Sequence, residues 1–264
     1  MIKLVILFLN INLILLNTMK TIRLTLVLFA VFVFSAACFA QLPILNTYDS
    51  PLPKVVAPGL NSPDGGVAAP SDAISLFNGK DLSEWTSKTG DAQWVVHDGM
   101  FTVKQGTGDI YTKKEFGDFQ LHIEFMHPSD ITGEGQMRGN SGIFLHGLYE
   151  IQVLETYANE NKTYVNGQAG AIYRQHPPLV NPLKKPGEWN AYDIIFTAPT
   201  FNADGTYRTN PRVTAMLNGI LIQNNAMVYG CTSDEKIVNK LTGGIKLQDH
   251  GCVVNYRNIW VREL

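Results

Sequence analysis

The stretch GIFLHGLYEIQVLE, residues 142–155, shows most directly how this chain folds. Apolar residues recur at every second position on either side of a central turn, as Ile143 and Leu145 before it and as Ile151 and Val153 after it. A period of two is the repeat of a β-strand, because successive side chains of a strand point to opposite faces of its sheet. We therefore expect strands over 142–146 and 150–155, each with one face in a hydrophobic core.

Similar short runs follow one another from about residue 73 to the last residue, separated by turn sequences such as Asn218-Gly219. The sequence has no amphipathic helix pattern longer than two turns and no repeat with a period of 20–50 residues. The other expected strands are 94–97, 100–104, 109–112, 119–126, 171–173, 190–197, 212–217, 220–224, 244–248 and 253–262. A dozen short strands without helices between them predict an all-β domain, an antiparallel β-sandwich over residues 73–264.

Residues 41–72 differ in composition from the predicted sandwich. They contain six of the thirteen prolines, with Gly, Ala and Ser between them. Because proline gives no hydrogen-bond donor to a sheet, we expect a linker here, or an arm that lies over the domain.

Residues 1–40 have the composition of an export signal: 30 are apolar, three are basic and none is acidic. Met19 begins a basic segment, then an apolar run and a small-residue exit, which is the pattern of a signal peptide cleaved after Ala40. Both apolar runs of this segment are shorter than the roughly 20 residues of a membrane helix. We expect an exported protein, periplasmic or at the cell surface; a lipoprotein attached through Cys38 and an uncleaved anchor are the alternatives.

The average composition, 45% hydrophobic with a formal charge of −2, mixes this segment with the rest of the chain. Residues 41–264 carry 18 basic and 23 acidic residues, a formal charge of −5. Their apolar and aromatic content excludes an intrinsically disordered chain. Their negative charge excludes nucleic-acid binding through a general basic field. No further apolar run in them is long enough to span a membrane.

Two cysteines, Cys231 and Cys252, would remain after export. A disulfide between them and two packed, reduced thiols both agree with the sequence. No Cys/His spacing matches a zinc site, and no glycine-rich dinucleotide-binding fingerprint occurs.

Six motifs occur in order along the predicted sandwich. They are ISLFNGKDLSEW (74–85), GNSGIFLHG (139–147), YEIQV (149–153), GEWN (187–190), GGIKLQDHG (243–251) and YRNIWV (256–261). In order and spacing they closely resemble the 3-keto-disaccharide hydrolase family. The resemblance implies a concanavalin A-like jelly roll, an exported bacterial protein, and a hydrolase that acts on glycosides already oxidised at carbon 3. Its substrate would be an oligosaccharide or glycoside, and a separate sugar 3-oxidoreductase would make the ketone.

The chemistry of such substrates defines what the site must contain. A ketone at carbon 3 acidifies the hydrogen on carbon 2, because the resulting carbanion is an enolate. Loss of the glycosidic oxygen from carbon 1 is then a β-elimination, and addition of water completes a net hydrolysis. The site needs a base, an acid for the leaving oxygen, and cations, hydrogen-bond donors or a metal at the enolate oxygen.

The period-two pattern indicates which side chains would form this site. Glu150 and Gln152 alternate with apolar residues on one strand, and by parity His146 shares the face of Glu150. Glu150 is the expected base, and a divalent metal ion, if one is used, would bind Glu150 and His146. The expected catalytic residues are Glu150, His250 and His146, and the expected substrate ligands are Arg138, Asn140, Gln152, Tyr173, Trp189, Lys246 and Gln248.

Two other functions stay open at this point: a non-catalytic glycan-binding module, and a conventional glycosidase with two carboxyl groups. The number of ionisable groups on adjacent strands favours an enzyme over a binding module. Only Glu150 is a carboxylate clearly expected on the polar face, since Glu155 falls on the opposite face by parity, and this disfavours the conventional glycosidase.

Overall fold

The structure, a computed structural model, describes residues 51–52, 54–55, 68–232 and 240–264. All of these residues belong to one compact unit, Leu45–Leu264. The expected signal peptide, Cys38 and most of the Pro-rich stretch lie outside the described residues. Among those that are described, no helix is long and apolar enough to cross a membrane.

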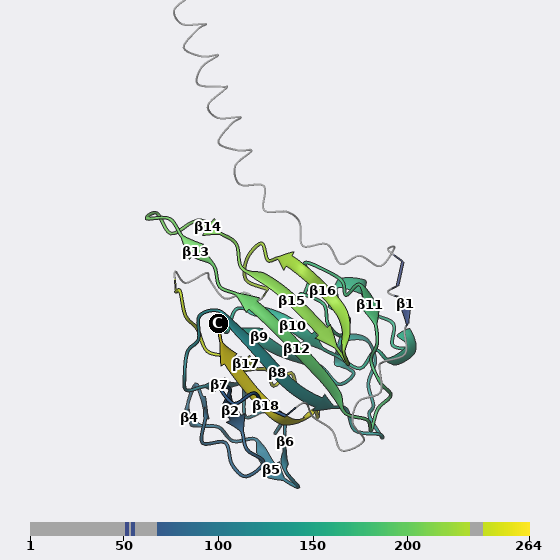
Figure 1. Cartoon of the computed structure of the whole chain (residues 1–264). Helices are drawn as coiled ribbons and strands as arrows, with labels where there is room; N and C mark the ends of the chain where they lie inside the picture. The colour runs from purple at the N-terminus through teal and green to yellow at the C-terminus, as the bar shows by residue number, and fades with distance from the viewer. Residues whose placement is uncertain (1–50, 53, 56–67, 233–239) are drawn as a thin grey trace, which may run out of the picture. The chain divides into compact units, whose positions relative to one another are not determined.

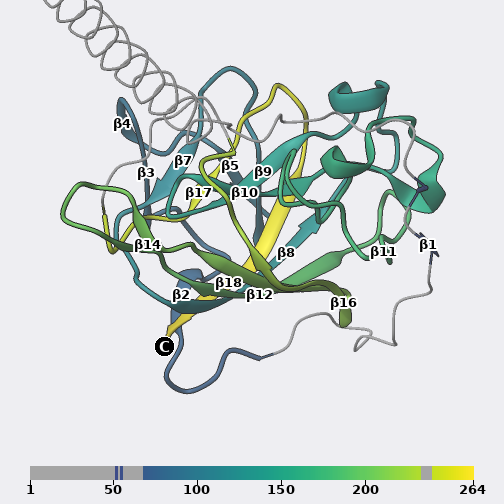
Figure 2. The same ribbon diagram turned by 90° about the horizontal axis from the view of Figure 1, so that it is seen from above.

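Two antiparallel sheets form a sandwich, which confirms the predicted fold class (Figures 1 and 2). The six-stranded sheet has the order β10 (Tyr149–Val153), β9 (Ser141–Leu145), β17 (Lys246–Leu247), β7 (Ile110–Thr112), β3 (Trp85–Ser87), β4 (Gly90–Asp91). The eight-stranded sheet has the order β16 (Ile220–Met227), β15 (Arg212–Leu217), β12 (Asn190–Thr197), β8 (Phe119–Met126), β18 (Asn255–Glu263), β6 (Met100–Thr102), β5 (Val95–His97), with β2 (Ile74–Phe77) paired to β18.

Smaller elements lie beside the two sheets. A parallel pair joins β1 (Lys54–Val55) to β11 (Val180–Asn181), and an antiparallel pair joins β13 (Thr200–Phe201) to β14 (Tyr207–Thr209). Three single-turn 3-10 helices lie between β8 and β11: η1 (Gly135–Met137), η2 (Tyr157–Asn159) and η3 (Val165–Gly167). The first pair places Lys54 and Val55, from the Pro-rich stretch, beside β11.

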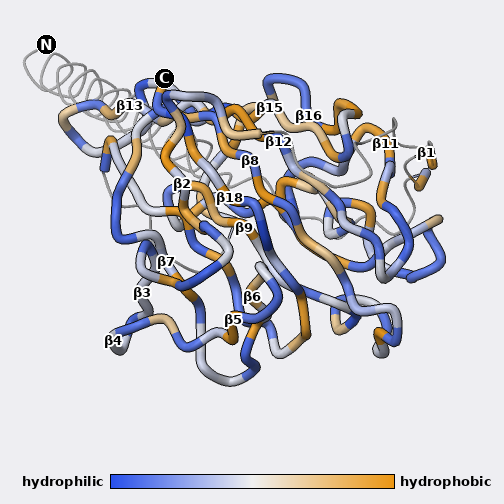
Figure 3. The backbone as a smooth tube through the Cα atoms, turned by 60° about the horizontal axis from the view of Figure 1, so that its bottom comes forward, coloured by the Kyte–Doolittle hydropathy of each residue, from blue (hydrophilic) through white to orange (hydrophobic). Residues whose placement is uncertain are grey.

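One hydrophobic core lies between the two sheets. Apolar residues alternate with polar ones along the strands (Figure 3), and the apolar face of each sheet turns inward. Tyr149 of β10 packs on Phe196 of β12 with the ring centroids 5.8 Å apart. The Tyr192 hydroxyl crosses the core and donates a hydrogen bond to the carbonyl of Gln152 at 2.8 Å. These contacts hold the six-stranded sheet, and therefore its outer face, in a fixed position against the eight-stranded sheet.

Some expected elements differ from the structure. The stretch 171–173 forms only isolated bridges, from Ile172 to Ile151 and to His176, because it runs beside the edge of β10 without continuing as a strand. The strands β3 and β4 escaped prediction because two or three residues are too few for an alternating pattern to appear. Cys231 and Cys252 are not joined by a disulfide; Cys252 is buried and Cys231 is half-buried, which agrees with the packed, reduced alternative.

Candidate active site

A row of four side chains crosses the outer face of the six-stranded sheet. The register pairs Glu150 with Phe144, Phe144 with Lys246, and Lys246 with Tyr111. Residues directly opposite each other on paired strands point to the same face. The residues that flank this row along the strands, among them Ile151, Ile143 and Leu247, belong to the core. The row therefore lies on the face turned away from the core, as expected for Glu150 and Lys246.

A second row lies beside the first on the same face. Gln152 pairs with Gly142, and the Gln248 N–H donates to the Gly142 carbonyl at 3.0 Å. Asp109 continues this row on the far side of Gln248, and its carboxylate accepts a hydrogen bond from the Asp249 N–H at 2.9 Å. The two rows together, Glu150, Phe144, Lys246, Tyr111, Gln152, Gly142, Gln248 and Asp109, are called the polar face below.

Burial gives Glu150 unusual electrostatics. Only 4% of this residue is exposed, and among the described residues its carboxyl group accepts no hydrogen bond and forms no ion pair. Burial therefore raises the pKa of Glu150 to about 8, although the positive charges of Lys246 and Arg174 act in the opposite direction; the negative charge of Asp109 raises it further. A carboxyl group with this pKa changes its protonation state near neutral pH, where an ordinary glutamate is fully ionised.

Lys246 supplies a buried positive charge close to this carboxyl group. Its Nζ lies 3.6 Å from Oδ2 of Asp109 and 3.7 Å from the centroid of the Phe144 ring. Only 4% of its side chain is exposed. A cation in such a dry position interacts more strongly with a nearby developing negative charge than a surface lysine would.

The edge of β10 carries a further cation. The Tyr173 N–H donates to the Glu150 carbonyl at 3.1 Å, so the chain returns beside β10 at this point. The guanidinium of Arg174 lies over the Tyr173 ring at 5.6 Å. Arg174 is exposed, has a left-handed backbone (φ 61°), and lowers the pKa of Glu150. Tyr173, an expected ligand, is thus adjacent to Glu150, and Arg174 joins it.

Gln136, in η1, is the centre of an amide network at the β10 end of the polar face. Its Oε1 accepts from Gln152 Nε2 at 3.0 Å, and its main-chain carbonyl accepts from Asn140 Nδ2 at 2.8 Å. The buried atoms Gln152 Oε1, Asn140 Oδ1 and Gln248 Oε1 have no partner among the described residues. Buried amides with unused acceptors are suited to the hydroxyl groups of a sugar.

His146 is not where parity placed it. Strand β9 ends at Leu145, and His146 has a left-handed backbone (φ 53°), so the alternation of faces stops there. Its ring packs against Phe196 at 4.7 Å and Phe119 at 6.3 Å, and its Nε2 contacts the Gly117 carbonyl at 3.1 Å. The expectation that it shares the face of Glu150 was wrong.

The expected metal ligands, Glu150 and His146, therefore do not meet. In the part of the chain that the structure describes, no group of three His, Cys, Asp or Glu side chains comes together as a metal site. The residues present do not fit the divalent ion that the sequence suggested, and no step of the proposed reaction involves one.

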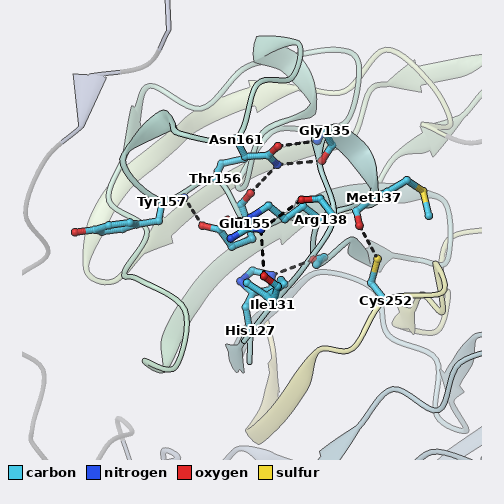
Figure 4. A network of polar contacts seen from close by, with 12 residues as sticks. His127, Ile131, Gly135, Met137, Arg138, Glu155, Thr156, Tyr157, Asn161 and Cys252 are labelled. Carbon is cyan, nitrogen blue, oxygen red and sulfur yellow. Dashed lines mark hydrogen bonds and ion pairs between the residues drawn. The ribbon is translucent and has the colours of Figure 1, made fainter. Parts of the chain in front are cut away.

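Trp189 and Arg138 are also separated from the polar face. The Arg257 guanidinium lies 4.1 Å over the Trp189 ring, and Arg257 is paired with Glu124 on the outer face of the eight-stranded sheet. Arg138 forms an ion pair with Glu155, and its Nη1 donates to the Ile131 carbonyl at 3.2 Å (Figure 4). Arg138 thereby ties the loop before β9 to the chain after β10.

His250 lies in the turn after β17 and is half-buried. Its buried Nδ1 has no hydrogen-bond partner among the described residues. The adjacent Asp249 accepts from the Gly251 N–H at 3.0 Å, which closes the turn. The turn begins directly after Gln248, so His250 lies at the end of the second row of the polar face.

Sequence reasoning missed four residues on the polar face or beside it. Asp109 and Tyr111 could have been found by parity, since they alternate with Ile110 in an expected strand. Gln136 and Arg174 lie in loops, where no periodic pattern indicates the direction of a side chain.

Comparison with known proteins supports the resemblance seen in the motifs. The family model of the 3-keto-alpha-glucoside-1,2-lyase-like domain matches residues 72–262. A solved candidate glycosyl hydrolase from Parabacteroides distasonis ATCC 8503 is 55% identical, covering 81% of this chain and 93% of its own, with a TM-score of 0.72. A second one from this organism is 22% identical, covering 72% and 92%, with a TM-score of 0.53, and shows the fold alone. The comparison with curated proteins found no match. The chain thus belongs to the family of 3-keto-alpha-glucoside-1,2-lyase-like domains.

Proposed function

We propose that this protein is a carbohydrate-active enzyme that cleaves 3-keto-glycosides by proton abstraction at carbon 2, β-elimination and hydration. The observation that carries the proposal is the buried carboxyl group of Glu150, with a pKa of about 8, near the ammonium group of Lys246. The family membership and the likeness to a candidate glycosyl hydrolase support a glycoside as the substrate.

The raised pKa matters because carbon acids need a strong base. The pKa of an ordinary glutamate lies near 4.5, so its carboxylate is a weak base toward the hydrogen next to a ketone. Burial of Glu150 strengthens the base by more than three pH units, while part of the population is still ionised at pH 7. Lys246 and Arg174 offset the negative charge that develops on the carbon 3 oxygen.

In the proposed reaction the glycoside is cleaved through an enolate and an unsaturated ketone. Glu150 takes the proton from carbon 2, and the bonding electrons form the enolate between carbons 2 and 3. The enolate collapses, the bond from carbon 1 to the glycosidic oxygen breaks, and His250 is the candidate donor of a proton to the leaving oxygen. Water then adds at carbon 1 and a proton returns to carbon 2, which regenerates the 3-keto-sugar as a free product.

The ketone requires an oxidation that precedes this step, so a separate sugar 3-oxidoreductase would supply the substrate. Export rests on the pattern of residues 1–40. Sequencing the first residues of the protein recovered from its host would test it, since cleavage after Ala40 leaves Gln41 at the amino terminus.

The activity is tested with matched substrates. The full chain is incubated with 4-nitrophenyl 3-keto-glucoside and with 4-nitrophenyl glucoside, and release of nitrophenol is followed. We expect turnover of the keto-glycoside only, deuterium at carbon 2 of the product in D2O, and loss of turnover in Glu150→Gln. Sugar binding without turnover of either substrate would leave the glycan-binding module instead.

A second candidate function is a conventional glycosidase, which the position of Asp109 favours. Its negative charge acts on Glu150, so a second carboxylate does lie near the first. An acid with a raised pKa beside an ionised carboxylate is the arrangement of retaining and inverting glycosidases. Turnover of the unoxidised glucoside, abolished by both Glu150→Gln and Asp109→Asn, would establish this function and reject the keto-sugar proposal.

A further inference from the structure

The relation between Glu150 and Lys246 requires a physical explanation. The two residues are in register on β10 and β17, with only β9 between them. Strands in a sheet are ~4.8 Å apart, so the two backbones are about 10 Å apart, within the combined reach of the two side chains. Opposite charges in a dry environment attract strongly. Nevertheless, the structure has no ion pair between Glu150 and the described residues.

Phe144 occupies the position between them. Lys246 Nζ lies over the ring, 3.7 Å from its centroid. The same ring also comes close to the Glu150 carboxyl group, since Phe144 Cε2 and Glu150 Oε1 both lie within 3 Å of the point where a Cβ on Gly142 would stand. Phe144 is buried but lies outside the hydrophobic core between the sheets. Its ring thus contacts the site on the outer face and adds nothing to the main core.

Resting on the function proposed above, we infer that Phe144 is a positioning residue, whose ring holds Lys246 against Asp109 and prevents it from pairing with Glu150. The ring face attracts the ammonium group through the cation–π interaction, and Asp109 binds it from the other side at 3.6 Å. A lysine that reached Glu150 would stabilise its carboxylate and weaken the base. The same lysine, held one strand away, can still meet the enolate oxygen of a substrate.

The other charges around Glu150 do not replace this arrangement. Arg174, on the returning chain beside β10, is exposed, so water screens its charge. Asp109, before β7, raises the pKa of Glu150. Tyr256, on β18, donates its hydroxyl hydrogen to Ser141 Oγ at 2.7 Å and stays neutral, because burial raises its pKa far above the ordinary value. The buried cation that must be kept from Glu150 is therefore Lys246.

The experiment measures the pKa of Glu150 directly, by carbon-13 NMR titration of the full chain labelled at glutamate Cδ, with Glu150→Gln to identify the resonance. We expect titration near pH 8 in the wild type and in Phe144→Tyr, which keeps the ring. In Phe144→Leu the pKa should fall by at least one pH unit. Should this variant not fold, Phe144→Met serves in its place. Phe125→Leu, at an equally buried core position, should leave the Glu150 pKa unchanged.

A double-variant comparison distinguishes an effect of Lys246 on the Glu150 pKa from an effect of water that enters when the ring is lost. If Phe144 acts through Lys246, adding Phe144→Leu to Lys246→Met will not lower the Glu150 pKa, because no lysine is left to approach. An equal fall in both backgrounds would mean that the lost ring only admits water, and would overturn the inference, as would an unchanged pKa in Phe144→Leu. The titration needs no substrate, so its result does not depend on whether the protein has the keto-sugar activity. If that activity exists, the rise of kcat/KM with pH should move with the measured pKa.

Discussion

The carboxyl group of Glu150 occupies the space that a side chain at Gly142 would fill. A Cβ on Gly142 would stand 2.5 Å from Glu150 Oε1, closer than any real carbon–oxygen contact allows. Gly142 is not among the glycines with positive φ, so the backbone itself would accept another residue. The glycine is needed because it leaves room for the Glu150 carboxyl group, which lies close to β9 and next to Phe144.

This contact predicts the effect of Gly142→Ala. The methyl group should displace the Glu150 carboxyl group and lower kcat/KM on the keto-glycoside about 100-fold, because a displacement of about 1 Å can cost that much. The free energy of unfolding should fall by only about 1–3 kcal/mol, the usual cost of overpacking. Gly117→Ala is the matched control, since its Cβ would meet its nearest neighbour at 4.0 Å. Equal losses of activity in both variants would reject the explanation.

The activity should increase with pH. Since the base must be deprotonated and the pKa of Glu150 is about 8, log kcat/KM should rise with unit slope up to pH 8 and then level off. Lys246→Met should move this limb to higher pH, because the ammonium group favours the ionised carboxylate. Initial rates between pH 5 and 10 measure both effects. A flat profile over this range would show that Glu150 is not the base.

The free energy of unfolding should also depend on the ionisation of Glu150, but it should fall as the pH rises. The pKa of Glu150 is about 8 in the folded state and has its ordinary value of 4.5 in the unfolded state. Between these pH values the unfolded chain ionises Glu150 while the folded protein keeps it neutral. The stability present below pH 4.5 is therefore lost as the pH rises to about 8. Relative to Glu150→Gln, the wild type should lose ~1.4 kcal/mol of unfolding free energy per pH unit in this window. Urea unfolding at several pH values provides the measurement. Glu263→Gln, at an exposed residue, should show no such difference.

A charged network on the outer face of the eight-stranded sheet provides a further prediction. His122 Nδ1 lies 2.7 Å from Asp193 Oδ1, and its Nε2 lies 3.5 Å from Glu124 Oε1. Burial alone would lower the pKa of His122, but the hydrogen bonds and charges of these two carboxylates outweigh it and raise the pKa to about 9. The stabilisation is therefore complete below pH 6.5 and is lost as the pH rises through about 9.

Asp193→Asn should remove part of this stabilisation. We expect a loss of about 2 kcal/mol at pH 6, the value of a hydrogen bond to a charged group, and a smaller loss at pH 10, where His122 is neutral in both proteins. Thermal unfolding at the two pH values gives the comparison. The exposed pair His97 and Asp98, 3.2 Å apart, offers the control, and Asp98→Asn should change little. Similar losses at pH 6 and pH 10 would contradict a charged His122.

The sequence predicted the fold well where strands are long enough to show their period. The strands β8, β12 and β15 occur over the predicted residues, because a strand of six to eight residues repeats the alternation three or four times. The stretch 171–173 and the strands β3 and β4 are too short for this. Their positions depend on the backbone of a neighbouring strand, which no local pattern records.

The residues of the candidate site show the same difference between positions in strands, which parity predicts, and positions outside them. Parity placed Glu150, Gln152, Lys246 and Gln248 on one face correctly, because all four lie in strands or directly after one. It failed for His146, since a single residue with positive φ ends the alternation. The expected position of Trp189 was also wrong, because this ring packs against Arg257 on the other sheet, and the two residues are far apart in the sequence.

What the sequence by itself determined is the class of fold and the side-chain faces of the longer strands, since both follow from the steric repeat of the extended backbone. The tertiary structure decided which strands lie side by side, and with them the neighbours of Glu150. Those neighbours set its chemistry, because the pKa of a carboxyl group depends on water exclusion and on charges within a few ångströms. Lys246 and Asp109 are about 100 and 40 residues away along the chain, yet they lie on the same sheet face as Glu150.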